Sequence, residues 1–135
     1  MSKRKLAVEF FVDRSLGRKH LPEALRAEGM TVHTMASVYG ENRAQSLKDV
    51  DWLADAGKQG WVVLHKDSAI RRRPAELQAL RNAKLRTFCL VNAQLKGHEQ
   101  TARFIDNLEA IIRRSSRPGP FIYAISERGL RKIDI

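Results

Sequence analysis

Short apolar runs alternate with segments of helical spacing from one end of the 135-residue chain to the other. The apolar runs are rich in β-branched and aromatic residues, and several stay apolar without interruption. That pattern is typical of strands buried on both faces of a parallel sheet. The segments between them would supply helices for both faces. We therefore predict an α/β fold, a three-layer α/β/α sandwich with a central, mainly parallel sheet of four to five strands.

The predicted elements can be placed by residue number. Strands are expected at residues 6–13, 31–35, 61–67, 85–92 and 119–126, the last as a closing strand or edge segment. Helices are expected at residues 21–29, 49–57, 73–83 and 98–114, with Gly57 ending the second and Pro74 in the first turn of the third. Residues 36–48 read as a loop. Because no linker or repeat interrupts this pattern, residues 1–135 are predicted to form one domain.

The composition narrows the partners of the chain. Its formal charge of +10 favours an anionic partner, either nucleic acid or an acidic protein, over a merely basic surface. No apolar run approaches the roughly 18 residues that a membrane span needs, and the charged start lacks a cleavage site. The lone Cys89 lies in an apolar run and can form no disulfide within the chain, which suits a cytoplasmic protein.

Two acids stand at matching strand ends. Asp13 closes the run "EFFVD" and Asp67 closes "VVLHKD". The carboxyl ends of parallel strands share one rim of the sheet, where ligands bind in open α/β folds. If the two strands are neighbours, both carboxylates could meet there. The alternative is that each Asp begins a turn or caps a helix.

A third acid lies at the start of the helix expected at residues 49–57. At 100° per residue, Asp49 falls on the same face as the apolar Trp52 and Leu53, towards the sheet. Asp51 and Asp55 fall on the opposite face and are interpreted as solvated acids. An N-cap role is the alternative for Asp49, and both roles are compatible.

Three carboxylates converging on one rim repel one another unless a cation lies between them. Oxygen ligands without a His or Cys cluster suit Mg²⁺ or Mn²⁺. Such ions can activate water and stabilise an in-line phosphodiester cleavage, while basic residues hold the phosphate backbone.

Three short motifs together resemble the PIN-domain superfamily, in its PIN-like branch. They are "FFVD" at residues 10–13, "DVDWLADAGKQGW" at residues 49–61 and "LHKD" at residues 64–67. They keep the order of the family pattern, and the resemblance covers residues 8 to about 92. The superfamily contains metal-dependent ribonucleases, including the VapC-type toxins of toxin–antitoxin pairs.

The resemblance implies roles for particular residues. Asp13, Asp49 and Asp67 would be the catalytic, metal-binding acids. PIN domains often have a fourth acid, for which Asp51 is the nearest candidate and Glu41 a weaker one. The resemblance further implies a central parallel sheet, dependence on Mg²⁺ or Mn²⁺, cleavage of RNA and a tightly bound antitoxin. Whether two copies of the chain form a homodimer is left open.

Basic residues flank the predicted acids. Arg71, Arg72 and Arg73 follow Asp67 at the start of a helix, where positive charge opposes the helix dipole. These arginines, with Arg14 and Lys66, are predicted to bind RNA phosphates or an acidic segment of the antitoxin; a solvated basic patch is the alternative.

The remaining polar and aromatic residues have less specific interpretations. Ser15 and Ser68 each follow a rim Asp, where a turn or cap role is expected. Tyr39 could stack on a base from within the loop at residues 36–48. Trp52, Trp61 and His65 are expected in the core.

Three other functions compete with a nuclease. A receiver domain would need paired acids after the first strand and a better placed lysine than Lys96. A haloacid-dehalogenase-type phosphatase would need an Asp where Ser15 stands. The more serious rival is a PIN-like module that is catalytically weak or inactive and binds RNA or protein.

Overall fold

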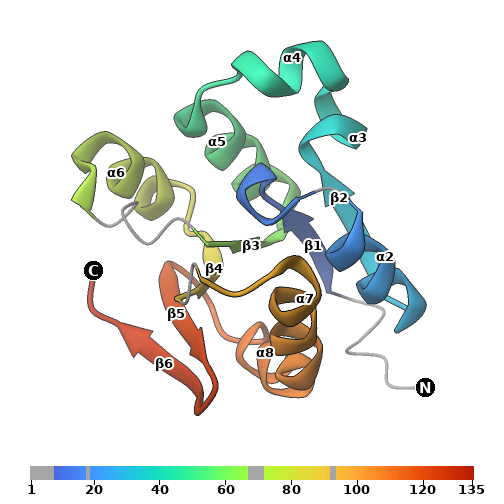
Figure 1. The fold of residues 1–135 in the computed structure, drawn as a ribbon. Helices are drawn as coiled ribbons and strands as arrows, with labels where there is room; N and C mark the ends of the chain where they lie inside the picture. The colour runs from blue at the N-terminus through green and yellow to red at the C-terminus, as the bar shows by residue number, and fades with distance from the viewer. Residues whose placement is uncertain (1–7, 18, 67–71, 92–93) are drawn as a thin grey trace.

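Six strands form one sheet in the order β2-β1-β3-β4-β5-β6 in the structure, a computed structural model that describes residues 8–17, 19–66, 72–91 and 94–135 (Figure 1). The strands are β1 (Glu9–Val12), β2 (Thr31–Thr34), β3 (Val62–His65), β4 (Arg86–Leu90), β5 (Phe121–Ser126) and β6 (Gly129–Ile133). The first five are parallel, and β6 pairs antiparallel to β5. The predicted α/β architecture with a mainly parallel sheet is confirmed, with six strands rather than four to five.

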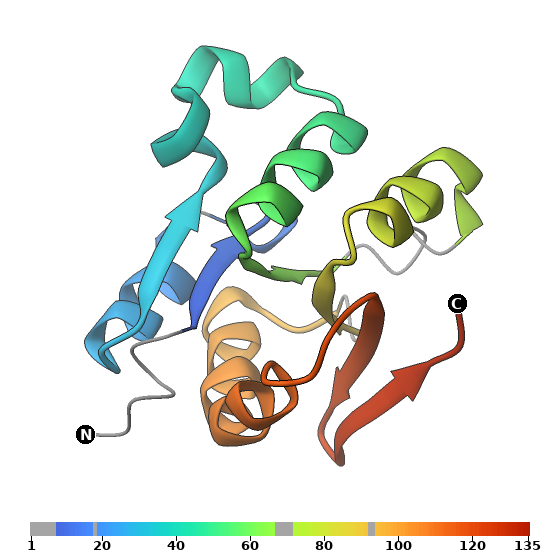
Figure 2. The same ribbon diagram turned by 180° about the vertical axis from the view of Figure 1, so that it is seen from behind.

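The helices cover both faces of the sheet (Figures 1 and 2). They are α2 (His20–Ala27), α3 (Met35–Tyr39), α4 (Glu41–Ser46), α5 (Asp49–Gln59), α6 (Pro74–Asn82), α7 (Gly97–Asp106) and α8 (Leu108–Arg114), with a 3₁₀ turn η1 (Arg14–Leu16) after β1. Among the described ranges, no helix is long and apolar enough to cross a membrane.

Side chains of alternate strand residues pack into two separate hydrophobic cores, one on each face of the sheet. Phe10 and Val12 of β1 pack with residues of α2, α7 and α8 on one face. Phe11 points to the other face and packs with residues of α5 and α6. Its ring stacks on Trp52 at 5.2 Å and on Trp61 at 5.7 Å between centroids, so the expected core positions of both tryptophans are confirmed. Cys89 is buried, as expected.

The expected loop at residues 36–48 is wrong. Thr34 accepts a hydrogen bond from the backbone N–H of Ser37, and the Ser37 hydroxyl accepts one from Thr34, so this capping box starts α3. Gly40 ends α3 and α4 begins directly after it. Both helices are short and polar, and therefore lack the periodic apolar face that identifies a helix in a sequence.

Two further helix predictions need correction. The helix expected at residues 98–114 is two helices, α7 and α8, which meet at Asn107. The helix expected to end at Gly57 continues to Gln59 and ends at Gly60, which takes the left-handed conformation that glycine adopts without strain. Pro74 is the first residue of α6, as predicted.

Candidate active site

The strand order reverses direction beside β1. The chain passes from β1 to β2 on one side, and later to β3 on the other side of β1. Ligands of open α/β sheets bind at the carboxyl ends of the strands where the order reverses in this way. Asp13 directly follows β1, and its backbone N–H donates to the carbonyl of Leu64 in β3 at 3.0 Å. The two strands are neighbours, which is the condition under which their terminal carboxylates could meet.

The carboxylate of Asp13 is buried, with 6% of the residue exposed. Its Oδ2 accepts hydrogen bonds from the Ser15 hydroxyl at 2.7 Å and from the Ser15 backbone N–H at 3.4 Å. Its Oδ1 is buried without a hydrogen-bond partner among the described residues. A buried carboxylate oxygen is costly unless a donor or cation satisfies it. This oxygen is therefore suited to a cation ligand.

Ser15 also joins the ends of β1 and β3. While its hydroxyl donates to Asp13, the same oxygen accepts the backbone N–H of Lys66 at 3.2 Å. The turn expected at Ser15 is thus a link between two strand ends. Asp67 is the next residue after Lys66 and lies outside the described residues, as do Ser68 and Arg71.

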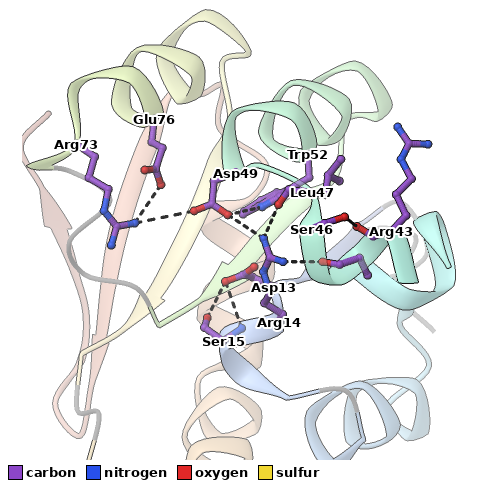
Figure 3. Close-up of polar contacts among 11 residues, drawn as sticks. Asp13, Arg14, Ser15, Arg43, Ser46, Leu47, Asp49, Trp52, Arg73 and Glu76 are labelled. Atoms are coloured by element: carbon purple, nitrogen blue, oxygen red, sulfur yellow. Dashed lines mark hydrogen bonds and ion pairs between the residues drawn. The ribbon is translucent and has the colours of Figure 1, made fainter. Parts of the chain in front are cut away.

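Asp49 is the first residue of α5, preceded by Lys48 as N-cap, so the N-cap alternative for Asp49 is wrong. The indole N–H of Trp52 donates to Asp49 Oδ1 at 2.9 Å, which confirms that the two side chains share one face. Arg14 lies 3.3 Å from Oδ1 and Arg73 lies 3.9 Å from Oδ2. Figure 3 shows this carboxylate directed towards both arginines.

Glu76, in the first turn of α6, is an acid that the sequence analysis did not single out. Its Oε1 lies 3.2 Å from Nη1 of Arg73, which also approaches Asp49 (Figure 3). Burial, and then the hydrogen bond and charge of Asp49, raise the pKa of Glu76. Burial alone would raise the pKa of Asp49, but hydrogen bonds from Trp52 and Glu76 and the pairing with Arg14 outweigh burial and lower it. Glu76 is therefore the first of the two carboxylates to take up a proton as the pH falls.

Arg14 connects α4 to the acidic site, which we define as Asp13, Asp49 and Glu76. One guanidinium nitrogen donates to the Ala44 carbonyl at 2.6 Å, and the other donates to the Leu47 carbonyl at 2.8 Å and to Asp49 at 3.3 Å. These three bonds hold the guanidinium between the end of α4 and the start of α5. Arg14 was predicted to bind RNA or a partner; in the structure its donors are directed at the protein itself.

The other predicted residues lie at different depths. Lys66 is half-buried, whereas Arg72 and Asp51 are exposed. The expectation that Asp55 is merely a solvated acid is wrong, because it accepts a hydrogen bond from the Tyr39 hydroxyl at 2.6 Å. Tyr39 also lies under the guanidinium of Arg43, 5.6 Å from the ring centroid.

Mg²⁺ and Mn²⁺ fit the donors of this site in chemical type. Within the described ranges, no three acids, histidines or cysteines are grouped closely enough to hold a metal ion. Asp13 and Asp49 nevertheless offer carboxylate oxygens on the rim, and Asp13 Oδ1 is buried without a donor. Hard divalent cations prefer such oxygens.

Comparisons with known proteins identify the family of the chain. A family profile described as a PIN like domain matches residues 8–92. The chain belongs to the PIN-like domain family. It is 42% identical, over 115 residues, to a Mycobacterium tuberculosis protein named "Putative ribonuclease VapC45", an alignment that covers 85% of this chain and 83% of that protein. No solved structure matches the chain.

The PIN-like match spans every acid discussed above. It includes Asp13, Asp49 and Glu76, together with the undescribed Asp67. One sequence signal could have identified Glu76, because an acid in the first turn of a helix directly after the predicted rim loop is favoured by the helix dipole. Its approach to Asp49, however, depends on how α6 packs against α5.

Proposed function

We propose that this PIN-like protein is an endoribonuclease, the toxin of a type II toxin–antitoxin pair. The observation that carries the proposal is the carboxylate of Asp13, buried at the switch point of the sheet with one oxygen unpaired in the described part of the chain. The ribonuclease name of the 42% identical relative supports the choice of RNA as substrate. The charge of +10 supports a polyanionic substrate.

In this proposal, Asp13, Asp49 and Asp67 are the catalytic acids and hold Mg²⁺ or Mn²⁺. Glu76 replaces Asp51 and Glu41 as the candidate for a fourth acid. Glu76 lies next to Asp49, whereas Asp51 is exposed on α5. A bound divalent cation supplies Lewis-acid stabilisation of the phosphate charge and a nucleophile at neutral pH.

The residues of the chain have separate tasks in this mechanism. Ser15 orients the Asp13 carboxylate through its 2.7 Å hydrogen bond, and Trp52 orients Asp49 through its 2.9 Å hydrogen bond. Fixed carboxylates require little reorganisation when the substrate arrives. Arg73 pairs with Asp49 and Glu76, and its charge would be available to an RNA phosphate if these acids held a cation. Lys66, Arg71 and Arg72 contact neighbouring phosphates.

The proposed partner is an antitoxin that covers this basic rim in the cytoplasm and prevents RNA from reaching the acids. An acidic segment of the antitoxin would pair with the same arginines that otherwise meet phosphate. The homodimer left open by the sequence is compatible with this role.

A specific observation favours a second candidate function, an inactive PIN-like module that binds RNA or protein. Arg14 and Arg73 both approach Asp49 and occupy part of the space in which a cation would be held. If they stay there in the presence of metal and RNA, the protein would bind without cutting.

Cleavage of RNA separates the two candidates. Purified protein is incubated with mixed single-stranded RNAs and Mn²⁺, beside Asp13→Asn and the control Asp106→Asn, an exposed acid at the end of α7. We expect the wild type and the control to cut, EDTA to stop them, and Asp13→Asn to be at least about 100-fold slower, the range in which loss of a catalytic group falls. Equal cutting by the wild type and Asp13→Asn, or no cutting by either, contradicts the assignment.

A further inference from the structure

A cavity of about 240 Å³ opens beside the acidic site, between the carboxyl ends of β1 and β2 and the helices α3 and α4. Its volume lies below the roughly 300–1,000 Å³ of sites for drug-sized ligands, and therefore suits one small ring system. Asp13 and Asp49 do not line it, whereas Glu41, the weaker candidate for a fourth acid, does.

The walls of this cavity divide into an apolar floor and a polar rim. Val12, Met35 and Ala44 are buried and line the floor. Gln45 and Glu41 are exposed at the rim, where Arg14 also lies. The flat faces of a nucleobase are apolar and its edge is polar, so the two halves of the cavity match the two parts of a base.

Arg14 ties the cavity to the acidic site. It lines the cavity and also a second surface groove, whose other walls include Asp49 and Glu76. Its guanidinium donates to Asp49 (Figure 3). It also donates to the carbonyl of Ala44, which belongs to the cavity floor. A nucleotide whose phosphate lies at the acids would therefore have its base within reach of the cavity.

We propose that this cavity binds one unstacked base of the RNA substrate, next to the bond that is cut. The inference rests on the proposed ribonuclease function and adds a base-binding subsite to it. Single-stranded RNA is recognised largely through splayed-out bases, whose faces pack on side chains and whose edges form hydrogen bonds. The Gln45 amide can both donate and accept a hydrogen bond, and can therefore distinguish one base edge from another.

Binding rather than cleavage tests the subsite. The full chain carrying Asp13→Asn is titrated into fluorescent hexanucleotides of A, C or U and into a hexamer with the same sugar–phosphate backbone but no bases. Fluorescence anisotropy reports the Kd of each complex. We expect at least one base-containing hexamer to bind about tenfold or more tightly than the abasic one, the range for burying one base.

Variants locate the effect in the cavity. Ala36 lines it from α3 and is half-buried, so Ala36→Phe fills the space with a ring. This change should abolish the advantage of bases while leaving abasic binding within about twofold, because phosphate contacts are untouched. Ala102→Phe, at an exposed position of α7, is the matched control and should keep the advantage. Gln45→Ala, also exposed, should reduce the discrimination between bases without a risk to folding.

The possible results separate this inference from the proposed function. No binding of any hexamer, abasic included, contradicts both. Equal binding of abasic and base-containing hexamers overturns the subsite but does not contradict the proposed ribonuclease function. A base preference that survives Ala36→Phe also overturns the subsite. If Ala36→Phe keeps the base preference but no longer co-purifies with the antitoxin, the cavity binds a side chain of the antitoxin instead of a base.

Discussion

Asp13 owes its position at the rim to backbone and side-chain bonds that are independent of any ligand. Its N–H is held by β3 and its Oδ2 by Ser15, while Oδ1 remains without a partner among the described residues. A buried oxygen without a hydrogen-bond partner lowers the free energy of unfolding of the protein. A cation bound to the folded state would offset this cost and stabilise the protein.

Ser15→Ala tests how far the orientation of Asp13 depends on one hydroxyl. The change removes the donor to Asp13 and leaves the Lys66 N–H without its acceptor. Loss of a residue that orients a metal ligand typically weakens metal binding about 10- to 100-fold. We therefore expect the Mn²⁺ concentration for half-maximal RNA cleavage to rise by about tenfold or more.

Ser15→Thr should restore most of this loss, because it keeps the hydroxyl. Ser116→Ala is the control, since its exposed hydroxyl bonds only to the turn at Arg113 in the contacts described. An unchanged Mn²⁺ titration for Ser15→Ala would show that Asp13 is oriented by the backbone alone.

Tyr39→Phe removes the hydrogen bond to Asp55 that joins α3 to α5. We expect a loss of about 0.5–1 kcal/mol in the free energy of unfolding, at the low end for hydrogen bonds because both groups are half-buried. Burial and Asp55 raise the pKa of Tyr39, so this stabilisation is fully present below the ordinary tyrosine pKa of about 10 and is lost as the pH rises through the folded-state pKa.

Urea unfolding at neutral pH measures the effect of Tyr39→Phe. A double-mutant cycle with Asp55→Ala isolates the pairwise contribution. A coupling energy near zero would show that the 2.6 Å contact is not maintained in solution.

At the scale of elements, apolar runs predicted the interior strands because burial on both faces leaves little room for polar residues. β6 escaped prediction because it is an edge strand whose Arg131 and Lys132 are exposed. The break at Asn107 escaped because the apolar face continues across it into α8. The pairing of Asp49 with Glu76 could not be predicted, since it depends on the packing of α6 against α5.

Gly57 sets how closely α5 and α6 approach each other. A Cβ added there would lie 2.5 Å from Cβ and 2.9 Å from the carbonyl oxygen of Ala83, so the elements would have to separate. We expect Gly57→Ala to destabilise the protein by about 1–3 kcal/mol, more than the roughly 1 kcal/mol that alanine gains over glycine in a helix. Thermal and urea unfolding measure the change.

Gly57→Ala should also slow RNA cleavage, because moving α6 separates Glu76 and Arg73 from Asp49. Ala83→Gly in the same chain removes the Cβ contact but not the carbonyl contact, and should restore part of the stability. A variant as stable as the wild type would mean that α5 and α6 can shift without cost.

At the scale of the whole molecule, the chain carries a formal charge of +10, while the candidate catalytic acids Asp13 and Asp49 lie at the end of β1 and the start of α5. Charge alone attracts RNA to any basic patch, but productive binding requires phosphate contacts beside Asp13 and Asp49. The salt dependence of binding distinguishes these situations, since each phosphate contact in a single strand contributes about −0.7 to the slope of log K against log salt.

Arg72→Ala should reduce the magnitude of that slope by about 0.7, because Arg72 is exposed next to α6 and free of the acidic site's hydrogen bonds in the contacts described. The matched control is Arg117→Ala, an exposed arginine before the amino end of β5, at the opposite end of the sheet. Anisotropy titrations of a short RNA with the Asp13→Asn protein at several salt concentrations give both slopes. Equal changes of the slope for the two variants would indicate that RNA binds the basic surface without preference. The rim that carries Asp13 and Asp49 would then not be the RNA-binding face.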